Sequence, residues 1–340
     1  MRILIKVILV LAAVAIKVFM GGDNLALMVL FLAAGFFMLI KGADWFVDGA
    51  GGIADRFGIS QLMIGLTIVA FGTSAPEAAV SITAATRGSG VDIAIGNVMG
   101  SNIMNVLLIL GLSALICPLP VQASTKKIEI PFVILVSAAV LVLGNFDGEL
   151  GHTDGLILLG CMAVFLIYTI ILAKKGGGGE EGEVKKLPVY ELIINIICGG
   201  TAIVLGSDIT VSSATEIARV MEMSEKLIGL TIIAFGTSLP ELITSCMASA
   251  KKKPDIAVGN IVGSNIFNLL FVLATSAAIT PLPYKNAATG ADFLIDNIVA
   301  IGAVVLLWAA VLNKDSKIKR PAGLIMFAAY AAYFAHLCMA

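Results

Sequence analysis

Charged residues are scarce in this chain of 340 residues. Asp, Glu, Lys and Arg together make up 13% of it, against roughly a quarter of a soluble domain, and hydrophobic residues make up 59%. This balance excludes an ordinary soluble domain. The formal net charge is −1 and no basic stretch is long enough to bind DNA or RNA, so no nucleic-acid partner is expected.

The residues that most often build catalytic and metal sites are also few. Only His152 and His336 can supply imidazole, and no phosphate-binding loop supports ATP-driven pumping. No His or Lys in an apolar segment is placed to act as a base, which argues against an intramembrane hydrolase. We therefore expect a protein that is not an enzyme and has no cofactor. The cysteines form no CxxC or Cys/His cluster, so they indicate neither a disulfide framework nor a zinc site: Cys117, Cys161, Cys198, Cys246 and Cys338.

Long apolar runs, by contrast, recur along the whole chain. Runs of about 20 residues are long enough to cross a ~30 Å hydrocarbon layer as helices. They are continuous rather than alternating, which excludes a β-barrel. The sequence therefore predicts an all-α, multi-pass protein of the cell (plasma or inner) membrane. Its ten core spans are expected near residues 25–46, 59–86, 92–116, 128–146, 154–173, 189–215, 225–250, 255–279, 291–312 and 321–339.

Basic residues gather in alternate loops, which sets the orientation of the spans. The rule that places positive loops in the cytoplasm puts the start of the first span outside. Because each half has five spans, an odd number, the second half is inverted relative to the first, as in many secondary transporters. We predict a first five-helix repeat at 25–173, a flexible cytoplasmic linker at 174–188 and a second repeat at 189–340. The basic loops contain Arg56, Lys126, Lys127, Lys174, Lys175, Lys185, Lys186, Lys251, Lys252, Lys253, Lys314, Lys317, Lys319 and Arg320.

Residues 1–24 form an apolar N-terminal extension, interrupted by Lys6 and Lys17, that has three interpretations. It is a cleaved signal sequence, an extra span, or an upstream extension with Met20 as the natural start. None of the three changes the assignment of the ten core spans.

A duplicated motif carries an acidic residue into the apolar segments. GLTIVAFGTSAPE at Gly65–Glu77 returns as GLTIIAFGTSLPE at Gly229–Glu241. A buried charge costs roughly 2.5 kcal/mol or more inside a membrane unless it is paired, and no Lys or Arg within these spans can pair with Glu77 or Glu241. A bound cation is therefore the expected partner of both carboxylates.

Neighbouring residues supply further oxygen atoms. Pro76 and Gly72 should break the helix and free backbone carbonyls, and Thr73 and Ser74 share a helical face with Glu77. A second motif, GNxxGSNIxN, follows each copy and adds a hydroxyl and an amide. Such a set suits Na⁺, Ca²⁺ or Mg²⁺. The candidate ligands are Glu77, Glu241, Thr73, Thr237, Ser74, Ser238, Ser101, Ser264, Asn105 and Asn268.

Other repeated residues are assigned structural roles. The glycine pairs Gly96/Gly100 and Gly259/Gly263 predict close helix packing. Asp44 and Asp208 are expected near span ends, as interfacial residues rather than ligands. Asp48, Asp55 and Arg56 are expected in a solvated loop, with Trp45 and Trp308 as interface anchors.

The doubled GTSxPE, each copy followed by GSNIxN, resembles the calcium/cation antiporter superfamily, most closely its sodium/calcium exchanger family of prokaryotic type. The resemblance implies ten helices in inverted repeats and Na⁺/Ca²⁺ exchange by alternating access, normally Ca²⁺ efflux driven by Na⁺ influx. It also implies roles for the candidate ligands. Glu77 and Glu241 are the carboxylates shared by Ca²⁺ and Na⁺, Thr73 and Thr237 add carbonyl and hydroxyl oxygens, Ser74, Ser238, Ser101 and Ser264 flank Na⁺, and Asn105 and Asn268 lie mid-site.

Ion coupling leaves alternatives. Proton-coupled relatives show GNxxE in place of GTSxPE, and some relatives, notably potassium-dependent ones, carry Asp where this chain has Asn268. GTSxPE in this chain favours coupling to Na⁺ rather than H⁺, and Asn268 argues against co-transport of K⁺. An H⁺/Ca²⁺ or other divalent-cation antiporter is the nearest alternative, followed by a K⁺-dependent exchanger and a passive cation channel. The expected partners are Ca²⁺, Na⁺ and the lipid bilayer, with the chain working as a monomer.

Overall fold

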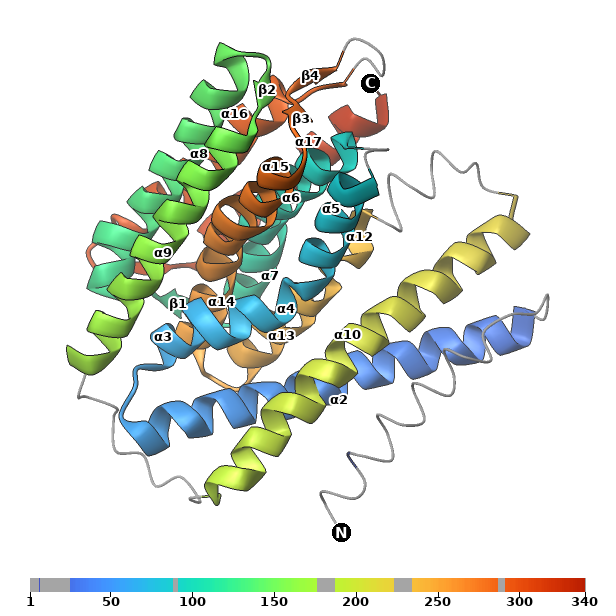
Figure 1. Cartoon of the computed structure of the whole chain (residues 1–340). Coiled ribbons are helices and arrows are strands. Elements are labelled where there is room, and N and C mark those ends of the chain that lie inside the picture. The colour runs from blue at the N-terminus through green and yellow to red at the C-terminus, as the bar shows by residue number, and fades with distance from the viewer. Residues whose placement is uncertain are drawn as a thin grey trace.

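The computed structural model describes residue 6 and residues 25–87, 91–175, 187–222, 234–286 and 291–339. Of the regions named above, the N-terminal extension apart from residue 6, most of the linker and residues 229–233 of the second motif lie outside these ranges. The described chain is a helical bundle in which one pair of long helices lies along the side of the others (Figure 1).

The first half of the chain contains five helical passages. They are α2 (Leu25–Phe57); α3 (Gln61–Ile64), η1 (Gly65–Val69), α4 (Ala70–Thr73) and α5 (Ala75–Arg87); α6 (Asp92–Met104), η2 (Asn105–Leu110) and α7 (Gly111–Ile116); η3 (Thr125–Glu129) and α8 (Ile130–Phe146); and α9 (His152–Lys175). The segments labelled η are π-helical turns within longer helices.

The second half repeats this order. Its helices are α10 (Val189–Val220); α12 (Ala234–Gly236) and α13 (Leu239–Ala250); α14 (Pro254–Phe267), η5 (Asn268–Leu273) and α15 (Ala274–Ile279); α16 (Leu294–Val311); and α17 (Arg320–Met339). Three antiparallel pairs of two-residue strands join loops: β1 (Leu119–Pro120) with β6 (Lys317–Ile318), β2 (Glu149–Leu150) with β3 (Leu282–Pro283), and β4 (Lys285–Asn286) with β5 (Ala291–Asp292).

Length and hydropathy support membrane crossing for most of the expected spans. Seven described helices pass as spans, and the bent pair Gln61–Thr73 and Ala75–Arg87 makes an eighth. Of the other two expected spans, one begins among residues outside the described ranges, and, within the described residues, α17 is not among the helices that pass. The prediction of an all-α, multi-pass membrane protein is confirmed.

The first span is longer than predicted. It was expected to end at residue 46, but α2 continues to Phe57, so Asp48, Asp55 and Arg56 lie in a helix rather than a loop, and Trp45 lies near its middle. The Gly-rich stretch after Asp48 stays helical, and two of its glycines, Gly49 and Gly52, face α10. A Cβ atom on Gly49 would lie 2.8 Å from the carbonyl oxygen of Leu192.

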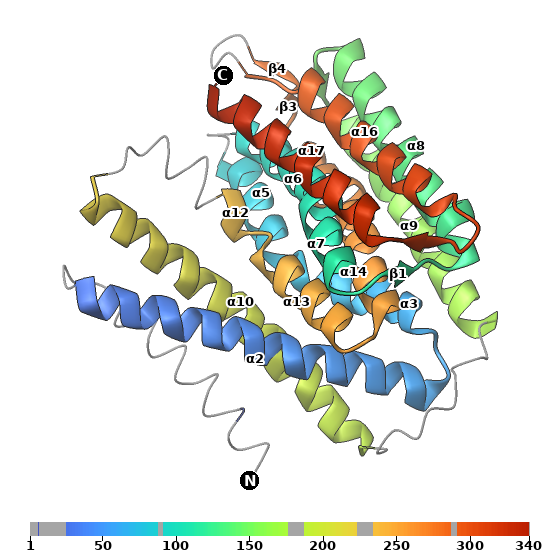
Figure 2. The same cartoon turned by 180° about the vertical axis from the view of Figure 1, so that it is seen from behind.

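The helices α2 and α10 form a closely packed pair. Figures 1 and 2 show them side by side along one flank of the bundle. Glycines allow the two backbones to approach: a Cβ on Gly42 would lie 2.9 Å from the Gly199 carbonyl oxygen, and one on Gly206 would lie 2.9 Å from that of Gly35. The pair therefore behaves as one structural unit beside the other helices.

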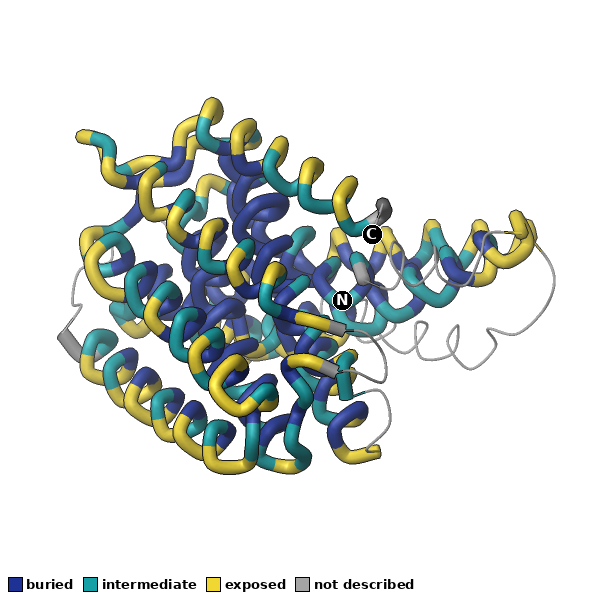
Figure 3. Tube along the Cα trace, turned by 90° about the horizontal axis from the view of Figure 1, so that it is seen from above, coloured by how far each residue is buried: buried dark blue, intermediate teal, exposed yellow. Residues whose placement is uncertain are grey.

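The remaining helices enclose a buried centre, seen as the dark region of Figure 3. The passage from α14 to α15 is almost wholly buried, and the α6–α7 passage is the next most buried. A Cβ on Gly259 or Gly263 would lie 2.7 Å from a backbone carbonyl oxygen of the second span, so the predicted packing role of this glycine pair is confirmed. A Cβ on Gly96 would meet only Phe293 among the described residues, at 3.5 Å.

Candidate cation site

Two helix breaks create the centre of the site. Ser74 (φ −82°, ψ 10°) separates α4 from α5, and Ser238 (φ −90°, ψ 5°) separates α12 from α13. The second span bends there by 50°. Because proline has no N–H, Pro76 and Pro240 leave the carbonyls of Gly72 and Gly236 without their helical donors. The break predicted from the motif is confirmed in both copies.

The two glutamates follow these breaks and are fully buried. Glu77 lies in the first turn of α5 and Glu241 in the first turn of α13, and neither side chain is exposed (0%). The positive end of a helix dipole lies at this turn, which favours an anionic side chain. None of the ion pairs formed by the described residues involves either glutamate.

Serines from both halves bind each carboxylate. Ser238 Oγ donates to Glu77 Oε1 at 3.2 Å, and Ser74 Oγ donates to Glu241 Oε1 at 2.8 Å. Ser101 and Ser264 add longer bonds of 3.4 Å, each to the glutamate of its own half. Each glutamate is therefore held by one serine from its own half of the chain and one from the other.

A pair of asparagines joins the broken spans to the third and eighth spans. Thr73 Oγ1 donates to Asn260 Oδ1 at 3.0 Å, and Thr237 Oγ1 donates to Asn97 Oδ1 at 3.3 Å. Each amide nitrogen is also used, since Asn97 donates to Ser81 Oγ and Asn260 to Ser245 Oγ, both at 2.9 Å. Asn97 Nδ2 also donates to the Glu77 backbone carbonyl at 3.3 Å, and because a carbonyl only accepts, this bond fixes which end of the Asn97 amide faces the threonine.

Four more asparagines form a reciprocal network deeper in the bundle. Asn105 Nδ2 donates to Asn265 Oδ1 at 3.0 Å, and Asn268 Nδ2 donates to Asn102 Oδ1 at 3.1 Å. Asn102 and Asn265 each donate to the other's backbone carbonyl, at 3.3 and 3.2 Å. Asn105 and Asn268 each begin a π-helical turn, a feature that often occurs at functional sites.

This network leaves four buried oxygen atoms without a donor among the described residues: Glu77 Oε2, Glu241 Oε2, Asn105 Oδ1 and Asn268 Oδ1. All four are acceptors. A buried acceptor without a partner costs about 1–3 kcal/mol. Among the described residues, no three or more His, Cys, Asp or Glu side chains lie close enough together to hold a metal ion by themselves. The donor set is thus two carboxylates with amide and hydroxyl oxygens, which suits a hard cation.

The structure buries most of the predicted site residues in one region of the bundle, where their hydrogen bonds form neighbouring groups, while Asn105 and Asn268 belong to the separate asparagine network. Serines and glutamates contact directly, and Thr237 is joined to Glu77 through Asn97, which donates to the Glu77 backbone carbonyl at 3.3 Å. Thr73 bonds Asn260, which bonds Ser245. Asn97 and Asn260 were not predicted as site residues. Both lie in the duplicated GNxxGSN, four residues before Ser101 and Ser264 and so on the same helical face, a signal that was available. Also missed were the supporting residues Asn102, Asn265, Ser81 and Ser245.

Asp44 lies outside this cluster. Lys251, directly after α13, bridges two carboxylates of α2: its Nζ atom lies 2.6 Å from Asp44 Oδ1 and 2.7 Å from Asp48 Oδ1. Lys253 donates to the Val47 carbonyl at 3.5 Å, and burial lowers the pKa of this lysine. These contacts tie α2 to the end of the seventh span. Asp44 therefore has a structural ion pair within the length of α2 rather than at its end.

Comparison with known proteins places this arrangement in context. The family model described as "Sodium/calcium exchanger protein" matches residues 27–171 and 191–339. The inner membrane protein YrbG of Escherichia coli is 36% identical over 82% of this chain and 87% of its own length. The sodium/calcium exchanger MaX1 of Methanosarcina acetivorans is 30% identical over 89% of this chain and 96% of its own length.

A solved structure is similar over nearly the whole chain. The sodium-calcium exchanger NCX_Mj, soaked with Na⁺ and Sr²⁺, superposes with a TM-score of 0.79 at 33% sequence identity. The match covers 92% of this chain and 99% of that one. The fold is therefore shared with an exchanger of known structure.

Proposed function

This chain belongs to the sodium/calcium exchanger family, and we propose that it is a secondary antiporter that exchanges Na⁺ for Ca²⁺ across the plasma or inner membrane. The normal direction is Ca²⁺ efflux driven by Na⁺ influx. The family and fold are those of transporters, and the ions are substrates rather than cofactors. YrbG is named an inner membrane protein, and MaX1 and NCX_Mj are named sodium/calcium exchangers, which supports the proposal.

Four buried oxygen atoms give the strongest support for cation transport. Glu77 Oε2, Glu241 Oε2, Asn105 Oδ1 and Asn268 Oδ1 are buried acceptors without donors among the described residues. A cation supplies what all four lack. The two carboxylates together provide −2, which one Ca²⁺ or two or more Na⁺ can neutralise. The proposed ligands are Glu77, Glu241, Thr73, Thr237, Ser74, Ser238, Ser101, Ser264, Asn105 and Asn268.

The same charges explain why the ions exchange without leak. A carboxylate left bare in a low-dielectric interior is costly, so movement of a half-neutralised site is opposed. Only fully loaded sites allow the α2/α10 pair to slide along the rest of the bundle. The close glycine contacts between α2 and α10 support their movement as one unit.

The two halves, residues 25–173 and 189–340, form inverted repeats in this proposal, joined by a cytoplasmic linker at 174–188. The reciprocal bonds Ser238–Glu77 and Ser74–Glu241 support such a relation, because each half completes the other's site. One chain therefore holds the whole ligand set, which supports a working monomer.

The direct test is Ca²⁺ uptake by proteoliposomes that contain the purified protein. Gradients of Na⁺, K⁺ and H⁺ are imposed in turn, each with the membrane potential clamped. An outward Na⁺ gradient should drive Ca²⁺ accumulation, and K⁺ or H⁺ gradients should not. Accumulation driven by pH would instead support the H⁺/Ca²⁺ antiporter, dependence on K⁺ the potassium-dependent exchanger, and downhill flux without any counter-ion a channel.

A further inference from the structure

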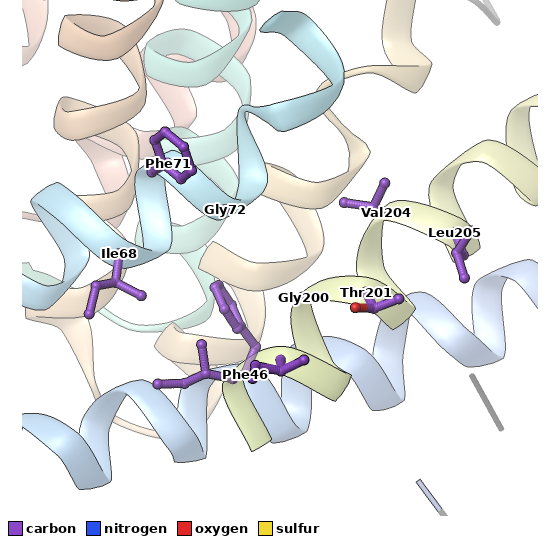
Figure 4. Close-up of a pocket in the computed structure, with 10 residues that line it drawn as sticks. Phe46, Ile68, Phe71, Gly72, Gly200, Thr201, Val204 and Leu205 are labelled. Carbon is purple, nitrogen blue, oxygen red and sulfur yellow. The ribbon is translucent and has the colours of Figure 1, made fainter. Parts of the chain in front are cut away.

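An apolar hollow of about 470 Å³ lies between the α2/α10 pair and the second span, outside the cation site. We propose that this hollow binds one acyl chain of a membrane phospholipid. The residues that line it come from α2, from η1 and α4, and from α10 (Figure 4): Phe46, Ile68, Phe71, Gly72, Ile196, Ile197, Gly200, Thr201, Val204 and Leu205.

The chemistry of the lining selects an apolar ligand. None of its ten residues is charged, and Thr201 has the one polar side chain among them. Apolar cavities of this kind stay dry and take up apolar molecules, and the volume falls within the roughly 300–1,000 Å³ of ligand pockets. A lipid headgroup finds no charged partner there, which leaves the acyl chain as the part that binds.

The hollow opens toward the hydrocarbon of the membrane. Phe71 and Ile197 on its rim are 60% and 61% exposed, and both belong to membrane-crossing passages. Acyl chains are the molecules that surround these surfaces at that depth. An acyl chain therefore reaches the hollow directly from the bilayer.

Sequence differences between the repeats create the space. Gly206 and Asp208 correspond to Gly42 and Asp44, and in this alignment Gly200 and Thr201 take the places of Phe36 and Phe37. Two small residues thus stand where the other repeat has two phenylalanines. The small residues of α10 therefore leave space that phenylalanines at the same positions would occupy.

The hollow adjoins the helix break that forms the cation site. Phe46 points from α2 toward Gly72, where a Cβ atom would lie 2.9 Å from the ring (Figure 4). Gly72 is two residues before Ser74, which donates to Glu241. An acyl chain in the hollow touches both α2 and the second span, so its presence should hold the pair in the arrangement seen here. This consequence for exchange rests on the proposed function, whereas binding of the chain does not.

Photolabelling tests the site without measuring transport. The full chain is reconstituted in liposomes with a phosphatidylcholine that carries a diazirine on one acyl chain, and labelled residues are mapped by mass spectrometry. Labelling at Ile68–Gly72 should saturate as the mole fraction of the photolipid rises. Leu135 and Val164, 66% and 65% exposed on α8 and α9, provide the comparison, where labelling should rise linearly. Linear labelling at both places would overturn the proposal.

A matched pair of variants sharpens the test. Thr201→Phe copies Phe37 of the other repeat and should fill the hollow, which lowers its labelling severalfold and leaves Leu135 unchanged. Thr201→Val keeps the size of the side chain and should retain the labelling. Thr201 is exposed, so both substitutions avoid the buried core. Unchanged labelling of the hollow in the phenylalanine variant would count against acyl-chain binding, whatever the exchange activity.

Discussion

The two halves of the chain are nearly identical around the proposed ion site. They differ in the long helices α2 and α10, which lie at the flank of the bundle. At the centre, Ser238 binds Glu77 as Ser74 binds Glu241, and Thr237 binds Asn97 as Thr73 binds Asn260. At the flank, α2 and α10 differ in size and charge at matching positions. The difference indicates that the shared site constrains both copies, whereas α2 and α10 have diverged.

The largest expected effect tests the equivalence of the central carboxylates. Glu77→Gln and Glu241→Gln each remove one charge of the pair, which should cost roughly 2–5 kcal/mol in ion binding, or at least about 30-fold in affinity. Na⁺-driven Ca²⁺ uptake should be lost in both variants.

Glu129→Gln is the control for these two variants. Glu129 is also a buried glutamate of a membrane span, and its Oε2 likewise has no donor among the described residues, but its Oε1 accepts from Tyr168 at 2.5 Å and it is not bonded to Glu77, Glu241 or their serines. Uptake should be retained in this variant. Near-normal uptake in both central variants would refute the site, and loss in only one would show that the halves are not equivalent.

The second prediction concerns the missed asparagines. Asn97→Ala and Asn260→Ala each remove the acceptor of a threonine and a donor to a serine, at about 1 kcal/mol per hydrogen bond, so Ca²⁺ affinity should fall roughly tenfold in both. The measurement is the Ca²⁺ dependence of the uptake rate. If the halves are equivalent, the two variants weaken affinity alike; a tenfold difference between them would refute the equivalence.

These residues also show how far the sequence predicts the molecule. Bilayer thickness sets the length of an apolar run, so most span positions could be predicted. The doubled motif also predicted that Glu77 and Glu241 lie within the apolar interior, where both are fully buried. The predicted end of the first span was wrong, because the glycine at position 49 suggests a helix break in the sequence but in the structure contacts α10. Asn97 was missed because its partner Thr237 lies 140 residues away and comes close only through the fold.

The third prediction addresses the ion pair that ties α2 to the core. Lys251 bridges Asp44 and Asp48, whereas the position in α10 that corresponds to Asp48 is Ser212. Asp48→Ser should release the contact with Lys251 and a longer one with Lys253 at 4.0 Å. Together they are worth about 0.2–1 kcal/mol for partly exposed pairs, so turnover should increase up to about fivefold. The uptake rate at saturating Ca²⁺ measures it.

Glu216→Gln is the matched control for this ion pair. Glu216 pairs with Arg219 at 2.7 Å within α10 itself, so its loss should not alter turnover. Equal rates for Asp48→Ser and the unmodified protein would show that the contacts of Asp48 with Lys251 and Lys253 do not restrain α2.

The smallest expected effect concerns the carbonyls freed by the two prolines. Ser207 Oγ donates to the Gly236 carbonyl at 2.7 Å, but the matching residue in α2 is Ala43, which has no donor for Gly72. Ser207→Ala removes a hydrogen bond worth about 0.5–1.5 kcal/mol and should lower the Tm of the purified protein by roughly 1–4 °C. Ala43→Ser is the converse change and should not lower the Tm if the new hydroxyl reaches Gly72. Were Ser207→Ala to leave the Tm unchanged, the donor from α10 would not stabilise the break, and the two breaks would be equivalent despite their different neighbours.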